Sequence, residues 1–378
     1  MRTINHNKVL WPLFVMLITT NCVEPYQAPL SSEETNVLVI DGFINTTAKS
    51  AQIKLSRSIA LSRKQQFPPE VKATVSIESE DGVLYPTVEK SSGSYEQSNL
   101  NLSAAKKYRL RIRLQSGSQY LSDYVKLSPS PILDAVSWTP EDTGIAIRVD
   151  AHDPAGVVKY YKWNYAETWE YTSNYESIYK MVKGVPVTRS PQDYIYKCWN
   201  TELSSKILLA TTSRLSQDIV NQYALTFLPV GTMKLSRKYS ILVQLRGVGE
   251  DEYIYWQQLQ KTTENLGGLF DPLPSQIAGN VHNEIDPLEV VLGYFSGGGL
   301  QEQRIFISHE ELPTYLQPVN RPFCQIDTLL AGLIKQYPGA LLISSYGSPS
   351  IIGYTTSTPI CIDCRESGGT LTKPDYWK

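Results

Sequence analysis

Hydrophobic and polar residues alternate along several short stretches of the chain, and this is the pattern of half-buried β-strands. Polar and apolar residues alternate at every position of residues 107–114, and they alternate over shorter stretches at residues 51–56 and 72–78. A Glu-Asp-Gly turn signal at residues 80–82 follows the stretch at residues 72–78. Short strands separated by turn signals in this way predict a β-sandwich of immunoglobulin-like type over residues 36–130.

A second group of strands follows a proline-containing linker at residues 128–131. We assign residues 131–310 to a second β domain, which carries a long, polar and tyrosine-rich excursion ending near Tyr196. Long loops in compact domains often carry function, so the excursion is a candidate recognition surface. An extra hairpin that only packs against the domain accounts for the same pattern.

One helix is expected inside the second domain, over residues 251–266. Three acidic residues can cap its start, and it is followed by the glycine pair at residues 267–268. Its apolar positions at helical spacing are Trp256, Leu259, Thr263 and Leu266. Further along, two strands flank a glycine turn at residues 297–299. Residues 311–378 form an irregular extension with a short helical candidate near residues 327–336.

The predicted fold class is therefore mainly β. It consists of two β-sandwich domains, immunoglobulin-like or fibronectin-like, and a helix-containing C-terminal extension that ends in a C-x-x-C tail.

The N-terminus has the layout of a lipoprotein signal peptide. A positively charged start precedes an apolar run over residues 9–18, which is too short to span a bilayer, and Cys22 follows shortly after it. In this interpretation residues 1–21 are removed and Cys22 is acylated, which places the protein on a membrane. Residues 22–35 contain two prolines and no apolar pattern, as expected of a tether.

The residues just before this cysteine depart from the usual lipoprotein pattern. Thr19 stands where leucine is common, and Asn21 stands where a small residue is common. An ordinary signal peptide with an incidental cysteine, or an uncleaved anchor, therefore remains an alternative to acylation at Cys22.

Four further cysteines follow, and an even number in an exported chain indicates disulfide bonds. Three pairings are possible among Cys198, Cys324, Cys361 and Cys364. The C-x-x-C spacing of the last two also fits a redox motif or half of a zinc site. It lies in a tail without a thioredoxin-like pattern, so we expect structural disulfides and no metal or cofactor.

Composition narrows the list of partners. The net charge is −2 and the chain has no basic run, so nucleic acid is not an expected partner. The 24 tyrosines favour β-structure and also provide amphipathic contact surface. Our candidates for ligand or partner contact lie in and beside the excursion, where simple packing is the alternative for each: Tyr165, Trp169, Tyr171, Tyr175 and Tyr179.

No motif in the chain indicates catalysis. The three histidines after the signal region show no metal-binding spacing, and there is no nucleophile elbow or phosphate loop. Asp150, His152 and Asp153 more often form a turn at a strand end than a metal site. Alternating arginines at positions 109, 111 and 113 indicate a solvated sheet face, with a binding stripe as the alternative. We expect that the protein is not an enzyme, and a hydrolase is the least favoured function.

Four stretches of the chain resemble the Bacteroidota lipoproteins of domain-of-unknown-function family 4249. These stretches are Cys22-Val-Glu-Pro, the strand at residues 39–44, the block at residues 253–280 and the tail at residues 361–377. The resemblance implies an outer-membrane lipoprotein encoded beside TonB-dependent transporters, with no catalytic residues to carry over. It leaves open whether the protein faces the cell surface or the periplasm.

From these observations we expect a lipid-anchored outer-membrane protein that binds a TonB-dependent transporter or its cargo. The alternative is an adhesive or structural protein of the cell envelope without a transporter.

Overall fold

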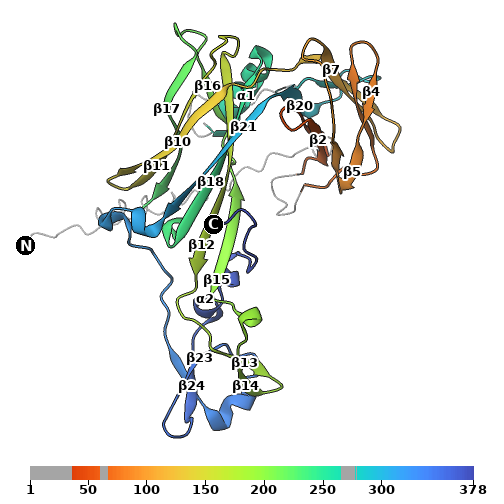
Figure 1. Ribbon diagram of the computed structural model, residues 1–378. Helices are drawn as coiled ribbons and strands as arrows, with labels where there is room; N and C mark the ends of the chain where they lie inside the picture. Colours follow the sequence, from red (N-terminus) through yellow and green to blue (C-terminus); the bar gives the residue numbers. More distant parts are fainter. Residues whose placement is uncertain (1–35, 60–66, 265–276, 278) are drawn as a thin grey trace, which may run out of the picture.

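Figure 1 shows the computed structural model, in which three regions of β-sheet make up most of the molecule. The structure describes residues 36–59, 67–264, 277 and 279–378. The predicted signal peptide, the acylation site at Cys22, the tether and the predicted C-terminal end of the helix lie outside the described residues. The prediction of a mainly β protein is confirmed.

The first sandwich encloses one hydrophobic core between two sheets. Ile40 and Ile53 from one sheet and Leu110 from the other are fully buried in this core. The strand orders are β20-β1-β2-β6-β5 and β19-β8-β7-β3-β4, and β9 also pairs with β7. The strands are β1 (Leu38–Asn45), β2 (Ser50–Arg57), β3 (Thr74–Ser79), β4 (Leu84–Pro86), β5 (Val88–Ser91), β6 (Ser94–Gln97), β7 (Lys107–Arg113), β8 (Gln119–Ser122), β9 (Val125–Lys126), β19 (Val281–Asn283) and β20 (Val291–Gly298).

Strand β7 shows how the alternating pattern determines which face is buried. Its apolar residues are buried and its basic residues are more exposed, as the period of two requires. The outward Arg109 and Arg111 both bind Glu78 on the adjacent strand β3. Hydrogen bonds from Arg109, together with the two positive charges, hold the pKa of Glu78 below its usual value although burial opposes this. The predicted solvated face is thus partly an ion-paired face.

The second sandwich also encloses one core between two sheets. Ile147, Trp163 and Val243 are fully buried there. The strand orders are β10-β11-β17 and β15-β12-β18-β21, and β16 also pairs with β12. The strands are β10 (Ile132–Glu141), β11 (Gly144–His152), β12 (Tyr160–Thr172), β15 (Lys197–Leu203), β16 (Leu208–Thr211), β17 (Ile219–Pro229), β18 (Lys238–Val248) and β21 (Leu300–Ser308).

A separate five-stranded sheet, which we call the distal module, lies at the lower end of the molecule in Figure 1. The excursion contributes a hairpin and the C-terminal extension contributes three strands, so two parts of the chain far apart in sequence build one sheet. The order is β14-β13-β23-β24-β22, formed by β13 (Tyr179–Val182), β14 (Val185–Thr188), β22 (Asp327–Leu330), β23 (Leu342–Tyr346) and β24 (Gly353–Thr356).

The predicted domain boundaries differ from the structure in two respects. The distal module takes its hairpin from the predicted second domain, and the extension predicted to be irregular supplies its other three strands. Strand β20 pairs in parallel with β1, and β19 pairs with β8, so residues 281–298 belong to the first sandwich and not to the second domain. The glycines at residues 297–299 were expected to form a turn between two strands. Gly297 and Gly298 instead end β20 in the first sandwich, and Gly299 leads directly into β21 of the second. A side chain at Gly299 would lie 2.4 Å from the Cβ of Ser130, so the close approach of the linker requires glycine.

Helices are few in the described residues. Helix α1 (Glu250–Glu264) confirms the predicted helix over its described part. The candidate near residues 327–336 is strand β22 followed by a 3₁₀ turn at Ala331–Gln336, so the helix prediction there was only partly right. The other helical elements are α2 (Pro359–Ile362) and short 3₁₀ turns at Pro191–Asp193, Met233–Leu235, His309–Glu311, Thr314–Leu316 and Cys364–Ser367.

Candidate functional site

Three of the five aromatic residues predicted to contact a partner lie in the core of the second sandwich. Tyr165, Trp169 and Tyr171 are each at least nine-tenths buried, so this prediction was wrong for them. The physical reason is that β12 continues as one strand to Thr172, and these side chains point inward along it. The hydroxyl of Tyr171 donates to the carbonyl of Cys364 at 2.8 Å, which ties the tail to this strand.

Of the remaining two tyrosines, Tyr175 packs beside Cys361 at the base of the distal module, and Tyr179 packs on the core of that module. The hydroxyl of Tyr175 donates to the carbonyl of Cys324 at 2.9 Å. The Tyr179 hydroxyl bonds that of Ser345 at 3.1 Å, and its ring packs edge-on against Tyr354. Both side chains are partly buried and have structural partners, so packing explains the tyrosines of this region better than partner contact.

The predicted disulfides are confirmed, and the structure selects one of the three pairings. Cys198 bonds Cys364, and Cys324 bonds Cys361. Each cysteine of the C-x-x-C pair therefore has a different partner. The first bond joins β15 to the tail, and the second bond closes the base of the distal module.

The histidines are separated from one another. His152 Nδ1 lies 2.8 Å from the Asp134 carboxylate on the solvent side of strands β10 and β11. His282 Nε2 is 3.8 Å from Asp123, and both of these side chains are more than half exposed. His309 Nδ1 bonds a backbone carbonyl.

The acidic neighbours of His152 have other partners. Asp153 accepts from three backbone amides of the residues that follow it, and Asp150 accepts from Gln222. Within the described ranges no group of three or more histidine, cysteine or acidic residues is placed to hold a metal ion.

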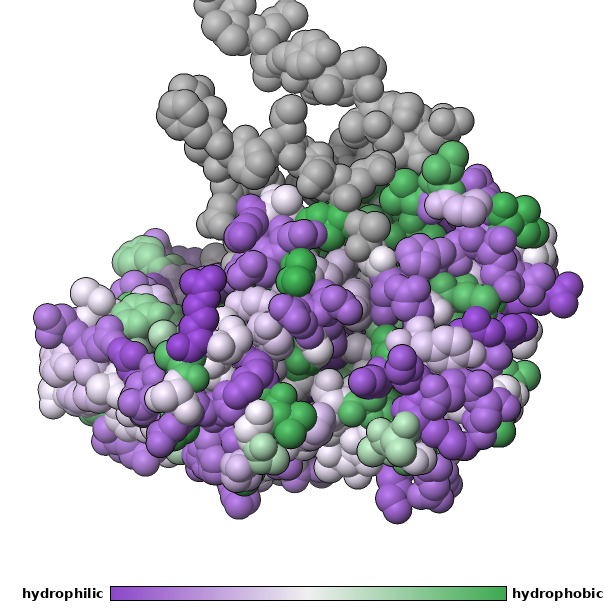
Figure 2. Space-filling model, turned by 90° about the horizontal axis from the view of Figure 1, so that it is seen from above, coloured by the Kyte–Doolittle hydropathy of each residue, from purple (hydrophilic) through white to green (hydrophobic). Residues whose placement is uncertain are grey.

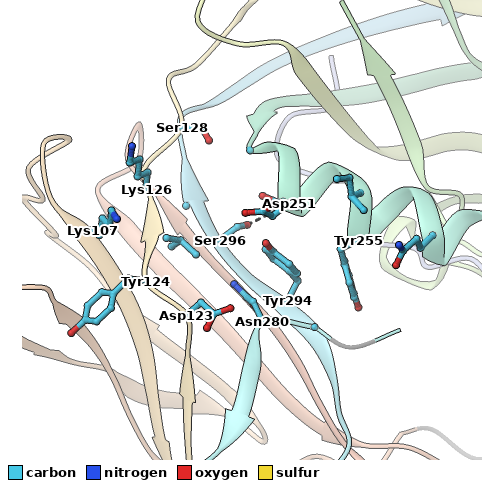
Figure 3. A pocket seen from close by; sticks show the side chains of 17 residues that line it. Lys107, Asp123, Tyr124, Lys126, Ser128, Asp251, Tyr255, Asn280, Tyr294 and Ser296 are labelled. Atoms are coloured by element: carbon cyan, nitrogen blue, oxygen red, sulfur yellow. Dashed lines mark hydrogen bonds between the residues drawn. The ribbon is translucent and has the colours of Figure 1, made fainter. Parts of the chain in front are cut away.

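A cleft lies between the first sandwich and helix α1 (Figure 3). Its volume of about 550 Å³ is in the range of pockets that hold small molecules. One wall comes from β7, β9 and the linker, the opposite wall from α1, and the floor from β20 and the residues before β19. The lining residues are Lys107, Asp123, Tyr124, Val125, Lys126, Ser128, Gly249, Asp251, Glu252, Ile254, Tyr255, Gln258, Gly279, Asn280, Tyr294, Ser296 and Gly297.

The helix wall is positioned by aromatic contacts on both sides of α1. Tyr253 packs on Tyr160 of the second sandwich with ring centroids 4.8 Å apart. Tyr255 packs on Tyr294 of the first sandwich at 5.0 Å. Acidic residues in the first turn of α1 suit the positive end of the helix dipole. The helix is thus wedged between the two sandwiches and gives the cleft a defined wall.

Beneath the cleft, a buried cluster of charged residues fastens the two sandwiches together. Glu252 of α1 accepts from Arg246 of β18 at 2.9 Å and from the Ser296 hydroxyl of β20 at 3.2 Å. Arg246 also donates to Ser296 and lies over the ring of Phe43 on β1. The indole of Trp256 donates to the same Glu252 carboxylate at 3.0 Å. Because buried charges need such partners, the cluster holds the walls in one arrangement.

The open charges of the cleft lie on opposite walls. Lys107 and Lys126 are directly paired across β7 and β9, and like charges in this position repel each other. Asp251 faces the cleft from α1 (Figure 3). In the described part of the chain, none of these three residues forms an ion pair with a protein group. The cleft can therefore offer cationic, anionic and tyrosine contacts to a bound molecule.

Sequence reasoning missed this cleft. Its walls come from residues more than 120 positions apart, which no local pattern joins. The one available signal was the lysine at the start of the alternating run over residues 107–114, and it gives no information about the opposite wall.

Among the described residues, no helix is both long enough and apolar enough to cross a membrane.

Two comparisons with known proteins bear on identity. A family model described as "Domain of unknown function (DUF4249)" matches residues 23–304 of the chain. This match covers both sandwiches except the last four residues of β21. No curated protein matches the chain.

Proposed function

The chain belongs to the DUF4249 family, and we propose that it is a non-catalytic, lipid-anchored protein of the outer membrane that assists a TonB-dependent transporter. It binds the transporter or its cargo. The cleft between the first sandwich and α1 is the observation that carries this proposal. It has the size of a small-molecule pocket, and its walls present Lys107, Lys126 and Asp251, which form no ion pair with any other described residue.

The chemistry of the cleft favours binding over catalysis. Ser296 and Glu252, which could take part in proton transfer, are already bound to Arg246 and to each other. A catalytic base needs a free position within hydrogen-bond reach of the reacting group. The side chains of Lys107, Lys126 and Asp251 instead suit recognition of a polar ligand with charged groups.

The lipid anchor would favour this binding by keeping the protein close to the transporter. An acylated Cys22 confines the protein to the plane of the membrane, which raises its effective concentration near a transporter in the same membrane. Weak contacts between the two proteins then suffice for a lasting association.

A pull-down in mild detergent tests the transporter part of the proposal. The tagged protein is recovered from its native membrane, and the bound proteins are identified. We expect a TonB-dependent barrel in stoichiometric amount. Recovery of the lipoprotein alone, or only with copies of itself, contradicts the accessory role and favours an adhesive or structural one.

A second experiment tests the cleft. Extracts of growth medium are passed over the immobilised protein, and small molecules retained by the wild type are compared with those retained by Lys126→Glu. Lys54→Glu is the matched control, because Lys54 is also exposed on the first sandwich but lies outside the cleft. A ligand that is lost only with Lys126→Glu supports cargo binding. A retained set that is equal for all three proteins contradicts it.

A further inference from the structure

The distal module is poor in charge compared with the rest of the protein. Its two segments, residues 178–188 and 327–358, contain only four charged residues, namely Lys180, Lys183, Asp327 and Lys335. Charged residues make up 19% of the whole chain, so an average pair of segments of this length carries about twice as many. Depletion of charge on a surface marks a region that is covered by another apolar phase or partner.

Apolar side chains are exposed at the end of the module that points away from the sandwiches. Strand pairing locates this end. Thr356 is the end of β24 from which the chain returns to the second sandwich, and it pairs with Asp327 and Leu342. The opposite ends of β22 and β24 therefore point away from the sandwiches. The distal residues Val182, Val185, Leu330, Ile351 and Ile352 are each between 41% and 57% exposed.

This exposure comes from separate elements. Val182 and Val185 flank the turn of the β13–β14 hairpin, whereas Ile351 and Ile352 lie in the loop between β23 and β24. Leu333 and Tyr337 add apolar surface on and just after the 3₁₀ turn at Ala331–Gln336. Figure 1 shows these elements side by side at the lower tip of the molecule, joined to the second sandwich through a narrow neck.

The module buries little apolar surface of its own. Its core contains three buried residues, Ile334, Leu342 and Tyr354. In contrast, the view from above in Figure 2 shows the opposite end of the molecule, where hydrophilic residues predominate and apolar groups are mostly scattered. The tip therefore exposes more apolar side chains than it buries, which is unfavourable in water.

The charges at the tip are all positive. Lys183 occupies the hairpin turn, and the stem of Lys335 lies beside the next residue, Gly184. Asp327 lies at the neck end of the module, and Asp193 outside the sheet is bound to Lys180. Within the described residues, no carboxylate pairs with Lys183 or Lys335.

We propose that the tip of the distal module inserts into the surface of a lipid bilayer that carries anionic headgroups. The valines and isoleucines enter the boundary between headgroups and acyl chains, and the two lysines bind headgroup phosphates. This contact is separate from the lipid at Cys22, and it would fix the orientation of the folded body on the membrane.

The distribution of side chains favours lipid over a protein partner. A protein interface buries one contiguous face, whereas the apolar side chains here extend from a hairpin, a loop and a 3₁₀ turn around one end. A fluid lipid phase can surround such an end. The positive charges next to the apolar groups match the phosphates that lie at that depth in a bilayer.

A flotation experiment tests this inference. The mature chain carrying Cys22→Ala, which has no acyl group, is mixed with vesicles of equal parts phosphatidylglycerol and phosphatidylcholine, or of phosphatidylcholine alone. We expect binding to the anionic vesicles that weakens with salt. The double variant Val182→Asp/Val185→Asp should lower binding by about tenfold or more, and Lys183→Ala by about fivefold.

Val88→Asp is the matched control, because Val88 is 56% exposed on strand β5 of the first sandwich and Val185 is 52% exposed on β14. It should bind like the wild type. A separate variant, Val182→Trp, reports insertion through the emission that it adds to that of the native tryptophans, measured as a difference from the wild type: this added emission should be shifted to the blue and quenched by brominated lipid. This readout needs no loss of binding and therefore does not depend on the folding of a damaged variant.

Three results would overturn the inference. These are failure of the Cys22→Ala chain to bind anionic vesicles, equal binding of the wild type and the double aspartate variant, and unshifted tryptophan emission. Loss of a co-purified barrel or of self-association in the aspartate variant, with vesicle binding unchanged, would assign the tip to a protein interface instead. The pull-down of the transporter with an intact tip tests the proposed function separately.

Discussion

The ammonium nitrogen of Lys162 lies 4.3 Å from the centre of the Trp256 ring, which joins strand β12 of the second sandwich to helix α1. Lys162 is only 7% exposed, and its nearest polar partner is the Asn164 side-chain oxygen at 3.4 Å. An aromatic ring and an amide stabilise a buried cation less than a carboxylate does. Burial, together with the charge of Arg246, lowers the pKa of Lys162 to about 7.

We predict that Lys162→Met stabilises the protein at neutral and acidic pH. The folded-state pKa lies below the unfolded value of 10.5, so the folded state binds fewer protons between pH 7 and 10.5 and wild-type stability rises with pH in that window. Below pH 7 the folded protein carries the full cost of a buried charge. Methionine removes this cost, so we expect a gain on the order of 3 kcal/mol at pH 6.

Denaturant unfolding at a series of pH values measures this effect. The difference between the wild type and Lys162→Met should shrink steadily from pH 7 and vanish near pH 10.5. Lys54→Met is the control, because Lys54 is exposed on β2 and should show no such dependence. A stability difference that does not change with pH would show that Lys162 acts through packing alone.

The lysine pair of the cleft gives a second prediction. Lys107 and Lys126 repel each other across β7 and β9, so Lys126→Thr should raise the free energy of unfolding of the ligand-free protein by about 0.2–1 kcal/mol. The gain should fall at high salt because the repulsion is screened. Lys54→Thr should have the opposite sign, since Lys54 faces Asp41 across β1 and β2. Thermal melts at low and high salt test both, and destabilisation by Lys126→Thr would contradict the prediction.

The disulfides give a third prediction. Removing Cys198–Cys364 through a double alanine substitution should lower stability by about 2–5 kcal/mol. This bond spans 166 residues and Cys324–Cys361 spans 37, so the chain-entropy term makes the first loss larger by about 1 kcal/mol. Non-reducing denaturant titrations of the two double variants compare the losses. Equal melting of a variant and the wild type would show that the bond does not stabilise the fold.

The sequence predicts the parts of this fold that depend on local pattern. The alternation over residues 107–114 places Leu110 inside, and the Glu-Asp-Gly signal marks a real turn, where Gly82 has φ +84°. The acidic start of α1 is correct to one residue. Each of these features is decided by residues within about ten positions of one another, where side-chain direction and turn chemistry dominate.

The parts that the sequence does not predict depend on long-range pairing. Strand β20 looks like a partner for its sequence neighbour β21, but it pairs with β1 from more than 240 residues earlier. The cleft could not be predicted for the same reason, because its floor contains Tyr294 of β20. The tyrosines of β12 were misassigned for a related reason, since a run rich in amphipathic side chains has the same composition in a core and on a contact surface.

Trp169 tests that distinction between core and contact surface. It is 6% exposed, and Lys234 lies over its ring at 4.8 Å, so we expect Trp169→Ala to lower stability by about 3–5 kcal/mol. Trp169→Phe keeps an aromatic core side chain and should cost far less. Partner recovery in the detergent pull-down should be unchanged for Trp169→Phe, because the indole does not reach the surface. A stable Trp169→Phe protein that no longer recovers its partner would restore this residue to the contact surface, and would require β12 to open when the partner binds.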